Sequence, residues 1–223
     1  LARTSPNVFA AVASWVEICD WIPSAICGIR NPRAIQRSRC AAGHKAMFEE
    51  EWGGLPSKAF LASLDPRLAD FRDNLYDACH TSDEIAGFLS AEFAEKTGLR
   101  VGIPVAVGAF DAHFGAVASM VQPGTFVKII GTSTCDIMVH PMDDPLPDVP
   151  GLCGIVRGSV VPGYFGLEAG QSAVGDIFNW VSSLTSKSHE ELTQEALALK
   201  PGQSGLLALD WHNGNRTILV DPR

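Results

Sequence analysis

The run PVAVGAFDAHFG, residues 104–115, leads a series of small apolar residues to a single carboxylate, Asp111. Its valine and alanine residues predict a strand at Val105–Phe110, while Gly108 and Gly115 allow another part of the chain to approach closely. A lone aspartate after a strand usually caps a helix or lies in a turn, but it can also act as a general base. The segment therefore predicts a strand that delivers one carboxylate to the edge of a site.

Downstream, TFVKIIGTSTCDIMV at residues 125–139 predicts two strands, Thr125–Gly131 and Asp136–His140, joined by a hairpin turn. The turn offers amide and hydroxyl donors from Gly131, Thr132, Ser133 and Thr134. Exposed amides in such a turn can form a concave anion site, and the hydroxyl groups add neutral donors around phosphate oxygens. A plain polar hairpin turn is the alternative interpretation.

The run FGLEAGQSAVGDIFNW at residues 165–180 predicts a strand, Tyr164–Glu168, followed by a helix from about Ser172 to Leu184. Gly175 and Asn179 are four residues apart and share one helix face. Glycine on that face would admit a flat ligand against the backbone. Close packing of the helix on a strand explains the same pattern equally well.

Upstream of residue 103 the pattern is mainly helical. An apolar stretch over residues 7–28 predicts a buried helix, with Pro23 opening a second helical segment. Residues 31–39 are basic and predict a loop, and residues 39–48 predict a short irregular segment that carries Lys45. Strands are therefore expected mainly after residue 103.

Caps and prolines predict the shorter elements. Helix starts are expected at Pro56–Ser57, with a helix to about Leu64, at Pro66, at Ser90, with a stop at Gly98, and at Ser188, with Glu191 in capping-box position. Thr81 and Glu84 have the same capping-box spacing. One further strand is predicted at Gly154–Pro162.

The composition limits the partners of the chain. It has 223 residues and a formal net charge of −8, which disfavours nucleic acid and anionic membrane surfaces. No apolar run in the sequence is long enough to span a bilayer. The 6 cysteines form no C-x-x-C pair, so we expect buried free thiols, no zinc site and a reducing, cytoplasmic location.

The histidines are given structural roles by their context. His113 lies beside Asp111 and is expected to pack behind the site. The others are expected at the surface or in loops: His44, His80, His140, His189 and His212. None has metal-ligand spacing with a cysteine, so no metal site is expected among them.

The order of these segments is more specific than any one of them. Matching runs are GHKAMF (43–48), EEWGGLPS (50–57), ASLDP (62–66), VAVGAFDAH (105–113), GTSTCDIMV (131–139) and GLEAGQSA (166–173), with LDWHNGNRTILVD (209–221) also compatible. They resemble the FGGY carbohydrate kinases, and within that family the members that phosphorylate ribulose. The resemblance implies an α/β, actin-like or ribonuclease-H-like kinase fold, with parts of two domains and a mixed sheet flanked by helices.

The resemblance also implies a role for each candidate residue. Asp111 matches the catalytic base that accepts the proton of the attacking sugar hydroxyl. Lys45 and Glu168 match positions that hold an open-chain ketose, since an ammonium donor and a carboxylate acceptor suit hydroxyl groups. A phosphate-binding loop matches Gly131, Thr132, Ser133 and Thr134, and the nucleotide side of the cleft matches Gly175 and Asn179. ATP and Mg²⁺ are implied, with no dedicated protein ligand for the metal beyond Asp111.

The implied reaction converts L-ribulose to L-ribulose 5-phosphate in arabinose catabolism, with domains at residues 1–103 and 104–223. Residues 1–103 lack the first phosphate hairpin of the family, and its later adenosine-binding segment is missing. A central fragment with little activity by itself is therefore expected. A kinase for xylulose, fuculose or glycerol is one alternative, and a non-catalytic actin-like nucleotide-binding module is another. The oligomeric state is left open, a homodimer included.

Overall fold

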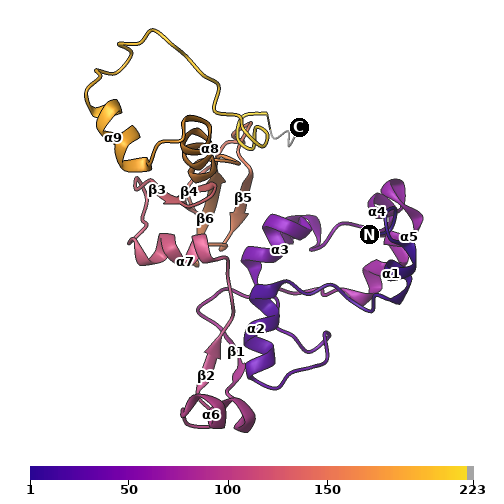
Figure 1. Ribbon diagram of the computed structural model, residues 1–223. Helices are drawn as coiled ribbons and strands as arrows, with labels where there is room; N and C mark the ends of the chain where they lie inside the picture. The colour runs from indigo at the N-terminus through magenta and orange to yellow at the C-terminus, as the bar shows by residue number, and fades with distance from the viewer. Residues whose placement is uncertain (220–223) are drawn as a thin grey trace.

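The computed structural model of the protein describes residues 1–219. The described chain spreads over three regions connected through α2 (Ile18–Ile26) and α3 (Arg39–Ala46) (Figure 1). One region holds α1 (Pro6–Ala11), α4 (Lys58–Leu64) and α5 (Pro66–Phe71), and a second holds β1 (Ile85–Phe88), α6 (Ala91–Thr97) and β2 (Pro104–Ala106). The third is a four-stranded sheet with α7 (Asp111–Ala118) beside it.

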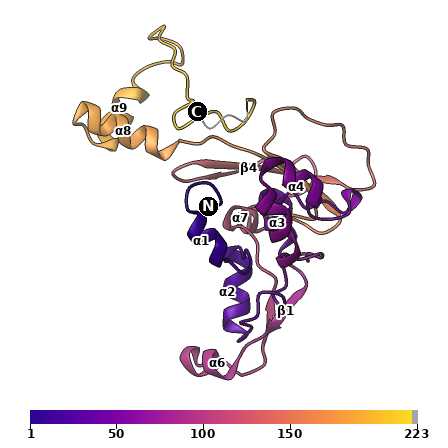
Figure 2. The same ribbon diagram turned by 90° about the vertical axis from the view of Figure 1, so that its right-hand side faces the viewer.

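Helices α8 (Gly175–Thr185) and α9 (His189–Leu197) project from the sheet away from α3 and α4 (Figure 2). The accessible surface is 14045 Å², whereas the scaling for a compact monomer of this mass gives roughly 9,900 Å². The arrangement is therefore open, and apolar side chains such as Trp52, Met120 and Leu207 stay exposed. No helix of residues 1–219 is long and apolar enough to cross a membrane.

The expected buried helix over residues 7–28 is wrong. The structure has two separate helices, α1 and α2, and α2 buries only Asp20 and Ser24. Pro23 lies inside α2 instead of opening a helix. Because proline has no N–H, the Cys19 carbonyl loses its partner within the helix. Gly108 packs against that carbonyl so closely that a Cβ there would lie 1.9 Å from the Cys19 oxygen.

The expected irregular segment at residues 39–48 is also wrong, because residues 39–46 form α3. Ser38 caps this helix, with its hydroxyl accepting from the Ala41 amide. Gly43 lies against β5, where an added Cβ would approach Val156 Cγ1 to 2.2 Å. The segment has too few apolar residues to predict a helix from the sequence, and its packing against the rest of the protein stabilises the helix instead.

The predicted caps are confirmed for the other short helices. Ser57 caps α4, Ser90 caps α6 before Gly98 ends it, and Ser188 and Glu191 form a capping box at α9. Pro66 is the first residue of α5, as expected. Two 3₁₀ turns complete this part of the chain, at Glu50–Trp52 and Arg72–Asn74.

Thr81 and Glu84 do not begin a helix, so that prediction is wrong. The Thr81 amide donates to Glu84 Oε1 over 3.0 Å, which is half of a capping box. The chain then continues into β1, a strand that the helical pattern upstream of residue 103 did not predict. β1 pairs with β2 in antiparallel fashion, and the next tertiary neighbour of β1 is α2.

The four-stranded sheet has the order β3-β4-β6-β5. Its strands are β3 (Val127–Ile130), β4 (Thr134–Pro141), β5 (Gly154–Arg157) and β6 (Tyr164–Ala169). Every ladder of the described residues is antiparallel, so the expected mixed sheet is wrong for this part of the chain. The connections at residues 131–133 and 158–163 are too short to cross over, and such short links can only reverse the chain.

Several predicted strands are shorter than expected. β2 ends at Ala106, and β5 ends at Arg157, since Gly158 adopts a positive φ of 65° and starts a turn. The main core lies between α7 and the sheet, where Ala116 and Ile137 are fully buried with Val127, Val139 and Val160. This packing fixes α7 against β3 and β4. It thereby sets the position of Asp111, the first residue of α7.

Candidate active site

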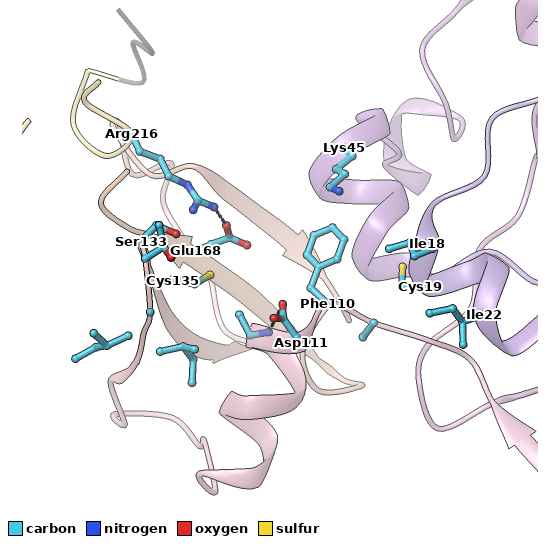
Figure 3. Close-up of a pocket in the computed structure, with 16 residues that line it drawn as sticks. Ile18, Cys19, Ile22, Lys45, Phe110, Asp111, Ser133, Cys135, Glu168 and Arg216 are labelled. Carbon is cyan, nitrogen blue, oxygen red and sulfur yellow. Dashed lines mark hydrogen bonds and ion pairs between the residues drawn. The ribbon is translucent and has the colours of Figure 1, made fainter. Parts of the chain in front are cut away.

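A cavity of about 860 Å³ opens between two walls (Figure 3). One wall is formed by Ile18, Cys19 and Ile22 of α2 with Lys45 of α3. The other is formed by the start of α7, the β3–β4 hairpin, Glu168 of β6 and Arg216. Predicted site residues that line it are Lys45, Asp111, Gly131, Thr132, Ser133 and Glu168. Residues far apart in the sequence are thus brought to one cavity.

Asp111 is the exposed carboxylate of this cavity. Its Oδ1 accepts from the Ala112 amide over 2.9 Å, and Oδ2 has no hydrogen-bond partner within residues 1–219. Burial of His113 and Ala116 on the same helix holds the first turn of α7 in place. The N-terminal end of a helix favours a negative charge. Asp111 is therefore a fixed acceptor with one oxygen free to receive a proton.

Glu168 is buried at the floor of the cavity, with 5% of its surface exposed. Arg216 Nη2 donates to its Oε1, and His113 Nε2 lies 3.1 Å from its Oε2. Burial by itself would raise the pKa of Glu168, but the His113 hydrogen bond and the charges of His44, His113 and Arg216 lower it to about 2. Glu168 is therefore a carboxylate at neutral pH and can only accept hydrogen bonds.

His44 is buried beside Glu168, so its predicted surface position is wrong. Its side chain is 6% exposed, and its Nδ1 lies 3.6 Å from Glu168 Oε2. Burial lowers the pKa of His44 to about 4, so the ring is neutral at pH 7. The burial of His44 was not predicted because it comes from a residue far away in the sequence. Gly154 of β5 packs directly on the imidazole, and a Cβ at that glycine would lie 2.6 Å from Nδ1.

Lys45 lies in the last turn of α3, on the opposite wall of the cavity. Its Nζ donates to Glu17 Oε2 over 2.9 Å and stands 4.9 Å from the centre of the Phe110 ring. The side chain is half exposed, so these contacts are exchangeable with those of a ligand. Figure 3 shows the Phe110 ring between Lys45 on one wall and Asp111 and Glu168 on the other.

The hairpin turn is confirmed, with Ile130 opposite Thr134 and residues 131–133 between them. The Gly131 and Thr132 carbonyls accept the amides of Gly175 and Val174 over 3.1 and 2.8 Å. A Cβ on Gly175 would approach the Gly131 oxygen to 2.7 Å, so glycine permits this close packing. The start of α8 thereby fixes the back of the turn and leaves its other side to the cavity.

Three predicted site residues do not line this cavity. Thr134 is buried, and its Oγ1 accepts from the Gln171 amide over 3.0 Å. Gly175 lies behind the hairpin, and Asn179 is exposed one turn further along α8. The pattern alone did not separate the front of the hairpin from its back.

Arg216 also lines the cavity, although it was not among the predicted site residues. It lies in a loop 48 residues after Glu168, yet its guanidinium contacts that carboxylate and lines the cavity. Its sequence signal is its place in the run LDWHNGNRTILVD, which is compatible with the family but implies no role for the arginine. A long-range ion pair leaves no local pattern, which explains the omission.

Residues 126–223 match the C-terminal domain of the FGGY family of carbohydrate kinases. The chain is 41% identical over 233 residues to the ribulokinase of Vibrio parahaemolyticus, covering 94% of this chain and 41% of that protein. It is 42% identical over 236 residues to the ribulokinase of Mycolicibacterium smegmatis, covering 99% of this chain and 40% of that protein. The chain belongs to the FGGY family.

Solved sugar kinases also share the fold. A xylulose kinase from Rhodospirillum rubrum superposes with a TM-score of 0.73 at 24% identity, covering 96% of this chain and 42% of that one. A ligand-bound xylulose kinase from Lactobacillus acidophilus gives a TM-score of 0.75 at 14% identity, covering 100% of this chain and 43% of that one. This FGGY chain thus spans about 40% of the length of the curated relatives it matches.

Proposed function

We propose that the chain forms the sugar-binding side and one phosphate loop of an ATP-dependent kinase that converts L-ribulose to L-ribulose 5-phosphate. The observation that carries this proposal is the meeting of Asp111, Lys45, Glu168 and the 131–133 turn at one cavity. Similarity to ribulokinases over nearly the whole chain supports L-ribulose as the sugar. A binding module without catalysis would need neither a free carboxylate nor polar sugar contacts.

Asp111 acts as the general base in this proposal. Its free Oδ2 accepts the proton of the sugar hydroxyl as that oxygen attacks the γ-phosphorus of ATP. The P–O bond to the ADP leaving group breaks, and the phosphoryl group moves to the sugar oxygen. The carboxylate both orients the hydroxyl and removes the proton late in the transfer.

Lys45 and Glu168 hold the open-chain sugar from opposite sides. The Lys45 ammonium donates to sugar oxygens, while the Glu168 carboxylate accepts from sugar hydroxyl groups. Arg216 lies beside Glu168 and adds donors at the same wall. Donors and acceptors at fixed positions suit a polyol, in which each hydroxyl both gives and takes a hydrogen bond.

The turn at residues 131–133 binds phosphate oxygens. The amides of Thr132 and Ser133 make no hydrogen bond within residues 1–219, so they are available with their hydroxyl groups. Thr134, Gly175 and Asn179 support the turn or contact the nucleotide from behind it. These amide and hydroxyl groups fit the phosphates of ATP. The protein has a net charge of −8, so the anionic oxygens must be held by donors in their immediate surroundings.

Mg²⁺ fits less well to the side chains of this cavity. It prefers carboxylate and water oxygens, and Asp111 is the exposed carboxylate here, whereas Glu168 is engaged by Arg216 and His113. The phosphates and water would therefore supply most ligands, with Asp111 nearby. The ion neutralises charge on the transferring phosphoryl group when bound.

We further propose a first domain at residues 1–103 and a second at 104–223, the last four residues lying outside the described part. The cavity then lies between α2 and α3 of the first and α7 and the hairpin of the second. An actin-like, ribonuclease-H-like arrangement of these two domains would close over both substrates and exclude water. Residues 1–223 by themselves should turn over little, since phosphoryl transfer needs positioning of the nucleotide on all sides.

The test is ADP release by the longest gene product that carries these residues, offered L-ribulose, D-xylulose, L-fuculose and glycerol. We expect preferential turnover of L-ribulose, and Asp111→Asn should reduce kcat by about 10²–10⁴ without changing the fold. Preference for another sugar would reassign the substrate within the kinase class. Absence of sugar-dependent ADP release from a folded protein would leave a nucleotide-binding module.

A further inference from the structure

Glu17 stands behind Lys45 at the start of α2, and the described residues that line the cavity include Lys45 but not Glu17. The Glu17 Oε2 atom accepts from Lys45 Nζ over 2.9 Å, and Oε1 accepts from the indole Nε1 of Trp15 over 2.9 Å. Each carboxylate oxygen therefore has its own donor. Glu17 meets the cavity through Lys45.

Glu17 is held in place independently of Lys45. Its carbonyl oxygen accepts from the amides of Asp20 and Trp21 over 3.0 and 2.9 Å, and Glu17 is the N-cap residue of α2. The side chain of Glu17 is 12% exposed, whereas that of Lys45 is 51% exposed. One end of this ion pair is thus fixed by the surrounding protein, and the other end lies at the solvent.

The segments that carry the two residues are also joined to each other. Arg37 Nη1 donates to the Trp15 carbonyl oxygen over 2.6 Å, and the Ser38 amide donates to Asp20 Oδ1 over 2.8 Å. Arg37 and Ser38 directly precede α3, while Trp15 and Asp20 lie on either side of Glu17 in the sequence. These contacts set the position of the Glu17 carboxylate relative to α3.

A second lysine has the same two kinds of contact but a more exposed carboxylate. Lys96 Nζ donates to Glu92 Oε1 over 2.6 Å and stands 5.0 Å from the centre of the Phe93 ring. The two side chains of that pair are 60% and 54% exposed. Such a pair contributes little, because two mobile side chains must be ordered to form it. At Lys45 only the lysine must be ordered, since Glu17 is already fixed.

We propose that Glu17 is the positioning residue for Lys45: it holds one N–H of the ammonium at α2, so that the other two N–H groups are presented to sugar oxygens in the cavity. An ammonium has three N–H donors, and within residues 1–219 Glu17 is its one hydrogen-bond partner. Without Glu17, the sugar itself would have to order the long lysine side chain, which weakens sugar binding. The statement about the sugar rests on the proposed function, whereas the hold of Glu17 on Lys45 does not.

The first test needs no substrate. The longest gene product that carries these residues is acetylated briefly with N-hydroxysuccinimide acetate, and mass spectrometry gives the rate at each lysine. Glu17→Gln keeps the size of the side chain but leaves one acceptor atom for two donors, Trp15 and Lys45. We expect Lys45 to react about threefold faster in this variant, because its amine is released from a fixed carboxylate.

Glu92→Gln is the matched control for the labelling experiment. It should change the rate at Lys96 by less than about twofold, because that pair is exposed at both ends, and it should leave the rate at Lys45 unchanged. An unchanged rate at Lys45 in the Glu17→Gln protein would overturn the proposal.

The second test separates positioning from a general loss of structure. We expect Glu17→Gln to raise the KM for the sugar about two- to tenfold, with kcat and the KM for ATP unchanged within about twofold. A poorly folded protein would instead lose kcat through a smaller active fraction. Trp15→Phe keeps an aromatic ring but removes the N–H that orients Glu17, so it should raise the same KM by less.

A Lys45→Met background shows whether Glu17 acts through the ammonium. Glu17→Gln should have no further effect there on the KM for the sugar. A folded Glu17→Gln protein with the wild-type KM for the sugar, or an undiminished effect in the Lys45→Met background, would overturn the positioning role. If the unmodified protein phosphorylates no sugar, the proposed function fails, and the labelling rates still decide whether Glu17 holds Lys45.

Discussion

Asp20 on the α2 wall and Glu168 on the β6 wall are both buried carboxylates, yet burial has opposite outcomes for them. They are 3% and 5% exposed. Burial is the largest influence on each and raises both pKa values. The pKa of Asp20 rises to about 6, whereas partners lower the pKa of Glu168 to about 2. The two walls therefore differ in what surrounds their charge.

The difference lies in the contacts of each carboxylate. Asp20 accepts the Ser38 amide over 2.8 Å, and its nearest cation, Arg37, stands 4.0 Å away. Glu168 has direct contacts with the guanidinium of Arg216 and the imidazole of His113. One amide and a distant cation do not offset the loss of water at Asp20, but a guanidinium in direct contact and the His113 hydrogen bond do so at Glu168. Burial alone therefore says little about the charge of a site carboxylate.

Glu168→Gln should have the largest effect, because it removes the shared partner of His113 and Arg216. We expect the free energy of unfolding to fall by about 3 kcal/mol at pH 7, since uncompensated charge is left behind. The folded-state pKa of Glu168 is below its unfolded value. Its stabilisation is thus present above pH 4.5 and is lost as the pH falls toward 2.

Urea unfolding of the wild type and of Glu168→Gln between pH 3 and 7 measures this loss. Asp111→Asn is the control, because Asp111 lines the same cavity but is exposed, and its stability should stay near that of the wild type. Equal stability of Glu168→Gln and the wild type at pH 7 would contradict the view that the ion pairs outweigh burial at this wall.

Asp20→Asn should have a smaller effect with the opposite dependence on pH. The folded-state pKa of Asp20 is above its unfolded value, so its contribution is complete below pH 3.8 and is lost as the pH rises through 6. About 2 kcal/mol of that contribution falls between pH 4.5 and 7, at 1.36 kcal/mol per pKa unit. The variant should lack this part of the pH dependence.

Unfolding midpoints of the two proteins at pH 4.5 and 7 check this expectation. Asp70→Asn, at an exposed aspartate of α5, serves as the control and should follow the wild type at both pH values. If Asp20→Asn and the wild type lose the same stability on going from pH 4.5 to 7, the folded protein does not raise the pKa of Asp20.

The features predicted correctly from the sequence are those made by neighbouring residues. The Ser90 cap with its Gly98 stop, the Ser188–Glu191 capping box and the 131–133 turn each involve groups a few residues apart. Their hydrogen bonds form in almost any tertiary context. The start of α7 at Asp111 was not predicted, because the sequence left open whether this aspartate caps a helix or lies in a turn.

The features that were missed depend on distant packing. α3 is helical because Ser38 caps it and Gly43 fits against Val156 of β5, more than a hundred residues away. His44 is buried where Gly154 of the same strand packs on its ring, and Arg216 reaches Glu168 across 48 residues of sequence. Lys45, Asp111 and Glu168 line one cavity, and the roles that the resemblance implies for them stay predictions. The groups that set the charge of Glu168 were not predicted.

Gly43→Ala should have the smallest effect and tests how firmly the two walls are joined. Helix α3 carries Lys45 on one wall and packs on β5 of the sheet that forms the other. The added Cβ would meet the stiff Val156 side chain at 2.2 Å, and such overpacking costs about 1–3 kcal/mol. Alanine recovers about 1 kcal/mol through its helix propensity. We therefore expect a net loss of about 1 kcal/mol, measured by urea unfolding.

Val156→Ala supplies the control that separates these two opposing contributions. In that background the clash is relieved, so Gly43→Ala should become stabilising by up to about 1 kcal/mol, which is the propensity gain alone. The same loss in both backgrounds would mean that α3 does not rest on β5 through Gly43. The position of Lys45 opposite Glu168 would then not be set by the sheet, and the two walls would have to be treated as independent bodies.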